Sequence, residues 1–230
     1  MRRTWTAVAV LLAIAAPVLA DDKKDEKKAA PANDDASIKK KLAEQKITVN
    51  FDGTPFLEVL QSLQELTDLN FVLDTAAHEN VESDEVKVTL QEKNAVAKDV
   101  LDKVLAKAKL SYEIWRGTVW IATKGNLPGK APRAKIAAET AKKLEKTVTL
   151  NFDGTPLVEV LAFLKDLSGV KFSTDKDLDA EQIVVSLKLK AVKAADVVDI
   201  LCRLTGLAVE SKNGAIVFLP KENAEMEKKK

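Results

Sequence analysis

Apolar residues follow two spacings along this chain, and these spacings alternate in the same order twice. In some stretches every second residue is apolar, which is typical of a strand with one buried face. In others the apolar residues recur every three or four positions, which is typical of a helix. From residue 46 to 123 the order is strand, helix, strand, strand, helix, strand, strand, and it recurs from 146 to 219. This predicts an α+β fold, a tandem repeat of two small β-α-β-β-α-β-β domains with helices packed on a small mixed sheet.

The two copies share one identical segment, Asn50–Pro55 in the first and Asn151–Pro156 in the second. Strand alternation ends inside it, and the Asp-Gly pair favours a turn. Threonine is a common N-cap, and proline is favoured at the first helical position. We therefore interpret four residues of each segment as the strand-to-helix joint of its domain. They are Asp52, Gly53, Thr54 and Pro55 in the first copy and Asp153, Gly154, Thr155 and Pro156 in the second.

Several elements outside this shared segment are also predicted. A lead-in helix is expected before each copy, at 37–45 with Ser37 as its N-cap and at 134–146. Residues 74–85 are polar and predict a loop, whereas Arg116-Gly117 and Asn213-Gly214 predict two-residue hairpin turns. The apolar residues of three long helices are expected to point inward. These are Phe56, Val59, Leu60, Leu63 and Leu66, then Leu157, Val160, Leu161, Leu164 and Leu167, and finally Val197, Val198, Leu201 and Cys202.

The first twenty residues have the composition of a secretory signal. Arg2 and Arg3 precede an apolar run at 8–16, and Val18-Leu19-Ala20 offers short side chains to a signal peptidase. The run is short for a hydrocarbon layer of about 30 Å, so we expect cleavage after Ala20 rather than a membrane anchor. The predicted organisation is a signal peptide at 1–20, a disordered tether at 21–36, a first domain with its lead-in helix at 37–123, a linker at 124–133, a second domain with its lead-in helix at 134–220 and a charged tail at 221–230.

Overall charge and cysteine content narrow the class of protein. The chain has 36 Lys and Arg against 35 Asp and Glu, which argues against bulk attraction to nucleic acid or to anionic lipid. Cys202 is the single cysteine, so no internal disulfide is expected, and it lies on an apolar helical face as a small core residue would. No integral membrane span is expected after the signal peptide.

Residues that could carry catalysis are sparse. His78 is the single histidine and is expected in an exposed loop, and no Cys/His cluster, glycine-rich phosphate loop or nucleophile elbow occurs. Repeated aspartates have structural interpretations: Asp74 and Asp175 as turn residues, Asp99 and Asp196 in the first turn of a helix. We therefore expect no catalytic residues, no cofactor and no metal, and we do not interpret the chain as an enzyme.

One aromatic feature occurs in the first copy alone. If Arg116-Gly117 is a two-residue turn, strand alternation places Trp115 and Trp120 on the outer face of the hairpin, near Glu113. Two tryptophans on an outer sheet face could form a partner-binding face, with Glu113 beside them. The alternative is that they cover the sheet locally, or pack against the lead-in helix or the other copy.

The residues of both copies resemble a known family. Residues 46–60, with 69–74, 88–90 and the hairpin that follows 110, are similar to the short N-terminal domain shared by secretins and TonB-dependent receptors, the STN domain. In the second copy, Leu167-Ser168-Gly169-Val170 continues the likeness. The resemblance implies a periplasmic recognition module, used for secretion, transport or signalling. No pore or plug segment follows the second copy, so a free-standing adaptor is expected.

From these features we expect an exported, non-catalytic protein-protein interaction module of a bacterial cell envelope. Its partners would be envelope proteins rather than nucleic acid, and a homo-oligomer is possible. Two alternatives stay open: a structural envelope protein that assembles with itself, and a small-ligand-binding protein that uses the cleft between the copies.

Overall fold

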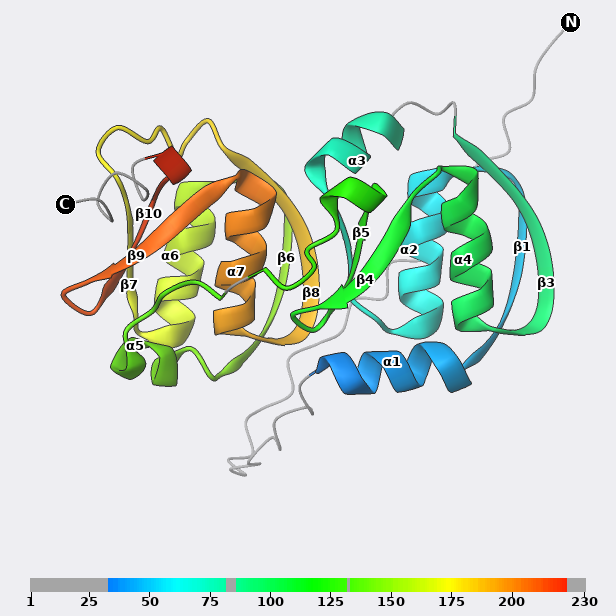
Figure 1. The fold of residues 1–230 in the computed structure, drawn as a ribbon, viewed down its shortest axis with the longest axis horizontal. Coiled ribbons are helices and arrows are strands. Elements are labelled where there is room, and N and C mark those ends of the chain that lie inside the picture. The colour runs from blue at the N-terminus through cyan, green and yellow to red at the C-terminus, as the bar shows by residue number, and fades with distance from the viewer. Residues whose placement is uncertain (1–32, 82–85, 132, 223–230) are drawn as a thin grey trace, which may run out of the picture.

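The computed structural model describes residues 33–81, 86–131 and 133–222. The predicted signal peptide, most of the tether and most of the charged tail lie outside the described residues. We call residues 33–126 the first half, 127–137 the connecting segment and 138–222 the second half. Within them, the predicted order of strands and long helices is present in both halves (Figure 1).

The bounds of the elements are as follows. The first half contains α1 (Asp35–Glu44), β1 (Lys46–Pro55), α2 (Phe56–Thr67), β2 (Phe71–Leu73), α3 (Thr75–Val81), β3 (Lys87–Val96), α4 (Ala97–Lys107), β4 (Ser111–Trp115), β5 (Thr118–Ala122) and the 3-10 helix η1 (Lys124–Asn126). The second half contains α5 (Ala138–Lys143), β6 (Thr147–Pro156), α6 (Leu157–Ser168), β7 (Lys171–Thr174), β8 (Val184–Lys193), α7 (Ala194–Thr205), β9 (Leu207–Lys212) and β10 (Ala215–Pro220).

The strands of each half form two separate sheets, not the single mixed sheet that we expected. β1 pairs with β3, and β6 with β8, as antiparallel two-stranded ribbons. The other strands form mixed three-stranded sheets in the orders β2-β5-β4 and β7-β10-β9. The long helices lie between ribbon and sheet (Figure 1), and α7, for example, contacts both β8 and β9. The α+β class with mixed sheets is confirmed, but the helices are covered on two sides.

The strand-to-helix joint is built differently from the prediction. β1 continues through Asp52-Gly53 to Pro55, and its register with β3 shifts between Phe51 and Thr54, so the Asp-Gly pair forms a β-bulge rather than a turn. Gly53 has φ +59°, and its N–H donates to the Thr89 hydroxyl at 3.0 Å. The second copy repeats this arrangement. The predicted turn was wrong because Asp-Gly, with glycine at positive φ, suits a bulge as well as a turn.

The helix that follows the bulge also begins one residue later than predicted. Pro55 occupies the N-cap position of α2, and Pro156 that of α6, with no side-chain capping hydrogen bond in either helix. Thr54 and Thr155 are therefore strand residues and not N-caps. The position of the joint was correct, but its capping chemistry was not.

Several smaller expectations were also wrong. α1 begins at Asp35, inside the predicted tether, and its N-cap is Asp34, whose Oδ1 accepts a hydrogen bond from the Ser37 N–H at 2.7 Å. Helix α3 replaces most of the predicted polar loop, because buried Ala77 and Val81 give it an apolar face. The second lead-in helix is reduced to α5.

Two of the predicted core leucines lie at the surface. Leu66 is 45% exposed and its counterpart Leu167 is 41% exposed. Each falls in the last turn of its helix, where Thr67 and Ser168 point inward instead. The hydroxyls of those two residues donate to main-chain carbonyls one turn earlier, so a buried polar side chain costs little there.

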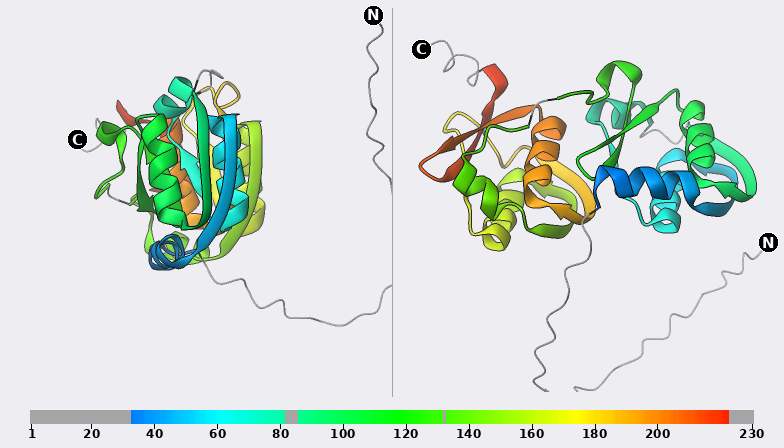
Figure 2. Two further views of the ribbon diagram at one scale, coloured as in Figure 1. Left: turned by 90° about the vertical axis from the view of Figure 1, so that its right-hand side faces the viewer. Right: turned by 60° about the horizontal axis from the view of Figure 1, so that its bottom comes forward.

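The two halves pack directly on one another through α7. The β2-β5-β4 sheet turns its outer face to α7, and the β8–α7 corner lies beside β2 (Figures 1 and 2). Four residues of that sheet, Val72, Trp115, Trp120 and Ala122, belong to the hydrophobic core of the second half. α7 therefore has its own core on one side and the first half on another, and every residue from Asp196 to Leu201 is buried.

Candidate functional site

The hairpin that carries the tryptophans has the predicted register. Ile114 pairs with Val119 and Glu113 with Trp120 in the β4–β5 ladder, so Trp115 and Trp120 lie on the outer face of the sheet. That face is covered: Trp115 is 7% exposed and Trp120 0%. The partner-binding face proposed from the sequence must be corrected, because these side chains are the first half's contribution to the contact between the halves.

The two indole rings form a compact aromatic pair at this contact. Their centroids are 5.3 Å apart with an interplanar angle of 82°, the edge-to-face arrangement that aromatic pairs prefer. The Arg116 guanidinium lies 5.3 Å from the Trp115 ring centroid, and that of Arg203 lies 5.5 Å from the Trp120 ring centroid. Arg203 comes from α7, so a cation–π contact joins the halves. The Trp120 Nε1 has no hydrogen-bond partner in the described chain.

Glu113, the third residue of the predicted face, has a local structural contact. Its Oε2 accepts a hydrogen bond from the Gly129 N–H at 2.7 Å, which fixes the connecting segment against β4. The sequence prediction of a plain linker at 124–133 therefore understated how firmly this segment is held.

A buried aspartate on α7 joins the first half, the connecting segment and the second half. Asp199 is 6% exposed, and its Oδ1 accepts from the Ala134 N–H at 2.7 Å. Its Oδ2 lies 2.9 Å from Arg116 Nε and 3.6 Å from Arg133 Nη1. The Arg116 contact is an ion pair whose direction does not satisfy hydrogen-bond geometry, since that Nε lacks a hydrogen-bond acceptor. Arg133 also contacts Asp196 Oδ1 at 2.7 Å.

Burial governs the acidity of this carboxyl group. Loss of solvent raises the pKa of Asp199, and the Ala134 N–H and the two guanidinium groups oppose that rise without cancelling it. A raised folded-state pKa means that the folded chain holds this proton more strongly than the unfolded chain does. The contribution of Asp199 to stability therefore decreases as the pH rises above the ordinary aspartate value of 3.8.

Sequence reasoning missed this cluster because its counterpart in the first copy is ordinary. Asp102 occupies the position equivalent to Asp199, and its side chain is 45% exposed and paired with Lys98 on the same helix. Two arginines at the contact also lack an equivalent arginine in the other copy. Arg116 of the first copy corresponds to Asn213, and Arg203 of the second copy corresponds to Ala106. Comparing the copies position by position would have marked these residues as specific to one half.

A second set of contacts joins the halves beside this cluster. The Asn70 side-chain amide donates to the Lys190 carbonyl at 3.0 Å and accepts from the Lys190 N–H at 2.8 Å. Asp68 Oδ1 pairs with Lys190 Nζ at 2.8 Å, and this hydrogen bond lowers the pKa of Asp68. The Asn33 N–H donates to the Ala191 carbonyl at 2.9 Å, so the start of the described chain is fixed here too.

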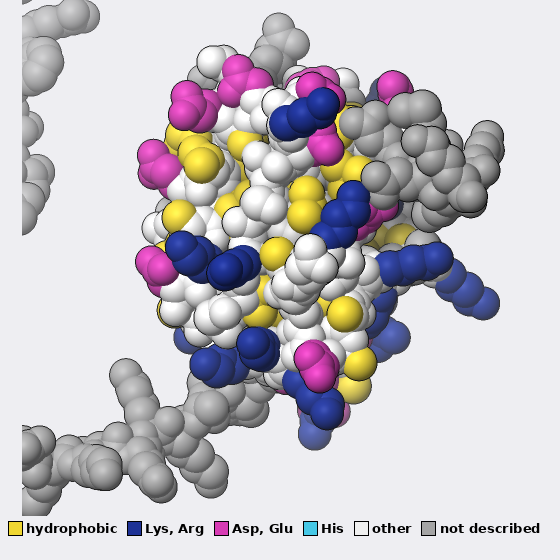
Figure 3. Space-filling model, turned by 90° about the vertical axis from the view of Figure 1, so that its left-hand side faces the viewer, with side chains coloured by type: hydrophobic (Ala, Val, Ile, Leu, Met, Phe, Trp, Pro, Cys, Tyr) yellow, Lys and Arg dark blue, Asp and Glu magenta, His cyan; other side chains and the backbone are white. Residues whose placement is uncertain are grey.

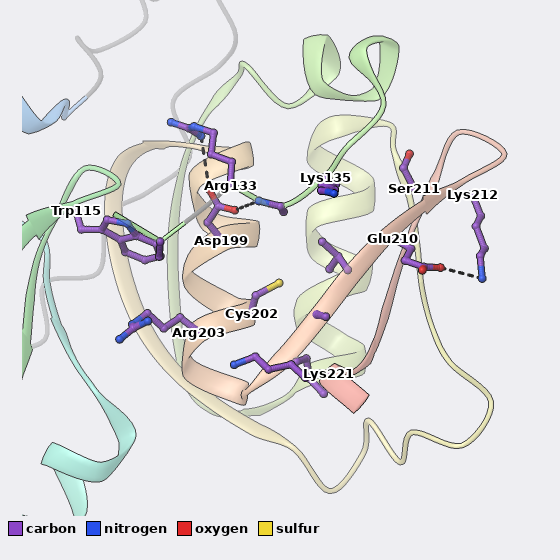
Figure 4. A pocket seen from close by; sticks show the side chains of 15 residues that line it. Trp115, Arg133, Lys135, Asp199, Cys202, Arg203, Glu210, Ser211, Lys212 and Lys221 are labelled. Carbon is purple, nitrogen blue, oxygen red and sulfur yellow. Dashed lines mark hydrogen bonds and ion pairs between the residues drawn. The ribbon is translucent and has the colours of Figure 1, made fainter. Parts of the chain in front are cut away.

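A groove of about 690 Å³ opens beside this contact, between α7, the connecting segment and the edge strand β9 (Figure 4). Its apolar part comes from Ala131, Ala134, Leu207 and Val209, and one end reaches Trp115. The remaining lining residues are Arg133, Lys135, Asp199, Cys202, Arg203, Ala208, Glu210, Ser211, Lys212 and Lys221.

The groove carries a positive charge excess. Five of its lining residues are basic, and the two acidic ones are already paired, Asp199 with the arginines and Glu210 with Lys212 at 2.9 Å. Lys135 and Lys221 are exposed and have no acidic partner in the part of the chain that the structure describes. They lie near opposite ends of the groove (Figure 4).

Cys202 lines the groove with its sulfur directed toward β9 (Figure 4). It packs partly against the core, as the sequence suggested. Burial raises the pKa of the Cys202 thiol to about 12, so the group is a neutral, weakly reactive surface and not a nucleophile.

β9 forms the rim of the groove and is the outer strand of its sheet. It pairs with β10 on one side, in the sheet order β7-β10-β9. The adjoining end of the molecule shows hydrophobic side chains among charged side chains of both signs (Figure 3). An edge strand beside an apolar, basic groove is a surface to which an extended chain can bind.

The other candidate residues from the sequence are not brought together. Asp74 Oδ1 accepts from the Ala76 N–H and Asp175 Oδ1 from the Asp177 N–H, so each caps its own turn. His78 lies in α3. Among the described residues, no group of three His, Cys, Asp or Glu side chains is arranged to hold a metal ion. In the same part of the chain, no helix combines the length and apolarity needed to cross a membrane.

Comparison with known proteins yields weak likeness. No family model matches the chain, and no curated protein does. Two crystal structures of a putative anti-sigma factor from Parabacteroides distasonis, at 2.50 and 1.65 Å resolution, each align with a TM-score of 0.30 and 13% identity. The alignments cover 48% of this chain and 46% of that one, so this chain matches less than half the length of the structures it resembles. A likeness of this size does not assign the chain to a family.

Proposed function

We propose that this chain is an exported, non-catalytic protein-binding module of a bacterial cell envelope. It is built from two domains that resemble the STN domain of secretins and TonB-dependent receptors, and it serves secretion, transport or signalling as an adaptor. The signal-peptide pattern of residues 1–20 supports export, and the repeated strand-helix pattern supports the family resemblance.

The groove along β9 is the observation that carries the binding function. It combines an unpaired strand edge, an apolar floor and flanking cations, which are the features of a peptide-recognition surface. The tryptophan pair supports the function indirectly, because it holds the first half against α7 and so keeps the groove wall in place.

Self-assembly through the sheet faces has less support. The residues of the second half that correspond to Trp115 and Val72 are Lys212 and Ser173, which are both exposed. The face that joins the halves is therefore not repeated at the free end of the molecule.

A crosslinking experiment in the native host tests the binding function. A photo-crosslinking amino acid at Ser211 would report on the groove, and the same residue at Lys103, on the exposed face of α4, would serve as the control. We expect protein adducts specific to Ser211 in the envelope fraction. Identical adducts from both positions, or none from Ser211, would contradict the proposal.

Export needs a separate test. Alkaline phosphatase fused after residue 36 is active only outside the cytoplasm, so we expect activity that is lost when the apolar run at 8–16 is interrupted by charges. N-terminal sequencing of the processed chain should begin at Asp21. Activity that does not depend on the apolar run would contradict export by this signal.

A further inference from the structure

We propose that the groove binds an extended, acidic peptide segment that adds as a fourth strand to β9. This inference rests on the proposed binding function and names the chemistry of its partner. It is carried by the free strand edge, the apolar floor and the flanking cations.

The outer edge of β9 has no partner strand among the described residues. In an antiparallel pair, every second residue directs its N–H and C=O toward the partner strand, and the intervening residues direct theirs away. Lys212 and Ala215 close the two-residue hairpin, so Leu207, Val209 and Ser211 are the residues whose polar groups face outward. None of these groups bonds to main chain elsewhere in residues 33–81, 86–131 and 133–222. They are available to a fourth strand.

The floor of the groove is largely apolar. The groove is lined by Ala131 and Ala134 from the connecting segment, by Leu207 and Val209 from β9, and by the neutral thiol of Cys202 from α7. A strand that pairs with β9 would direct alternate side chains to this floor, because side chains alternate in direction along a strand. The floor requires apolar residues at those positions.

Two lysines give the groove positive charge at its ends. Lys135 and Lys221 lie near opposite ends of the groove and are without carboxylate partners among the described residues, as noted above. Carboxylates on the solvent-facing positions of the bound strand would meet them, whereas a basic strand would be repelled. The chemistry therefore favours alternating apolar and acidic residues in the partner.

One wall of the groove is held in place before any peptide binds. The connecting segment forms one wall of the groove, and Asp199 fixes it through the Ala134 N–H and Arg133. Glu113 fixes the same segment further back through the Gly129 N–H. A wall held at two points loses little freedom when a strand binds, which raises affinity for a given contact.

Titration of the full chain with two synthetic peptides tests the inference. The probes are acetyl-Glu-Val-Ser-Val-Glu-Val-Glu-amide and the same peptide with every Glu replaced by Lys. We expect the acidic peptide to bind at least about tenfold more tightly, and we expect it to slow amide exchange at Leu207, Val209 and Ser211. Equal binding of both peptides, or no binding of the acidic one, would overturn the proposal.

Two variants locate the binding on the edge of β9. Ser211→Pro removes one outward N–H without breaking a bond to β10, and Ser211→Ala is its matched control. We expect the proline variant to lose binding by about tenfold and the alanine variant to retain it. If the proline variant unfolds, the exposed double substitution Lys135→Glu with Lys221→Glu should abolish the preference for the acidic peptide. Undiminished binding by a folded proline variant, or an unchanged preference, would refute strand addition.

Other occupants give different results. If the three amides exchange slowly before any peptide is added, the groove is already filled, by the chain itself when protection is independent of concentration and by a second copy when it is not. Either result would overturn an external partner. If the peptides fail while crosslinks from Ser211 persist, strand addition is wrong but the binding function stands.

Discussion

Replacing Trp120 with alanine tests how firmly the two halves are joined. The side chain is fully buried, belongs to the core of the second half and is contributed by the first half. Its removal therefore leaves a cavity at the contact rather than within either half, and the matched control is Val217→Ala, at the equivalent and only partly buried position of β10.

The size of the effect follows from the contacts. A buried tryptophan withdraws roughly 200 Å² from water, worth about 5 kcal/mol at roughly 25 cal/mol per Å². The edge-to-face contact with Trp115 adds about 1 kcal/mol. The substitution also removes a buried Nε1–H that has no acceptor, which offsets roughly 1–3 kcal/mol of this loss of stability. We expect a net loss of about 4 kcal/mol in the free energy of unfolding, within the usual range for tryptophan-to-alanine substitutions.

Urea unfolding followed by far-ultraviolet circular dichroism is the assay, because it does not depend on tryptophan fluorescence. Trp120→Phe separates packing from hydrogen bonding: the indole N–H has no acceptor, so phenylalanine should cost no more than about 1.5 kcal/mol. A loss below about 1 kcal/mol for the alanine variant, or equal losses for it and Val217→Ala, would refute the described packing.

Three further predictions concern other parts of the molecule. Asp199→Leu removes the carboxylate beside Arg116, whose side chain is only 15% exposed, and should cost about 3 kcal/mol in urea unfolding. Asp102→Leu should cost far less, and equal losses would contradict the ion-pair network around Asp199. At about pH 8 the thiolate fraction of Cys202 should be roughly a thousandfold below that of a thiol of pKa 9.0, so a disulfide reagent should react slowly. The free energy of unfolding should fall as the pH rises from 9.0 toward 12, because the folded chain holds the thiol proton more strongly than the unfolded chain does. Fast labelling would contradict the burial of the thiol. Ala191 has φ +52°, so Ala191→Gly should raise the free energy of unfolding by about 0.5 kcal/mol. The control Ala106→Gly, in α4, should lower the free energy of unfolding by about 1 kcal/mol. A loss of stability at both positions would contradict backbone strain at Ala191.

Local sequence patterns predicted much of the fold because they report on one element and its immediate neighbours. The two hairpins and the outward face of Trp120 follow from spacing and turn chemistry, and the start of α2 was predicted to within one residue. The division into ribbon and sheet did not follow, because it depends on which strands pair across the helices. The bulge at Gly53 and the short helix α3 were missed where one residue pattern suits two local structures.

The candidate site lay beyond such patterns for a different reason. From its helix alone, Asp199 would be predicted to lie at the surface, because the equivalent residue Asp102 does. It is buried because the first half and the connecting segment cover α7, and both contacts join residues far apart in the chain. The free edge of β9 is likewise a property of strand order, which the alternation of apolar residues does not encode.

The unequal faces of the two three-stranded sheets limit how far a repeat of this kind can grow. Trp115 and Trp120 give the β2-β5-β4 sheet an apolar outer face on which the second half packs. The equivalent residues of the β7-β10-β9 sheet, Lys212 and Val217, do not form such a face. In the first half, α4 is the helix equivalent to α7. Its charged residues Lys98 and Asp102 are exposed to solvent, whereas the equivalent surface of α7 is covered by the first half. A duplicated gene can lengthen by further copies only while a terminal surface accepts the next one. Among the described residues, neither the outer face of the β7-β10-β9 sheet nor the exposed face of α4 repeats the surface that joins the two halves.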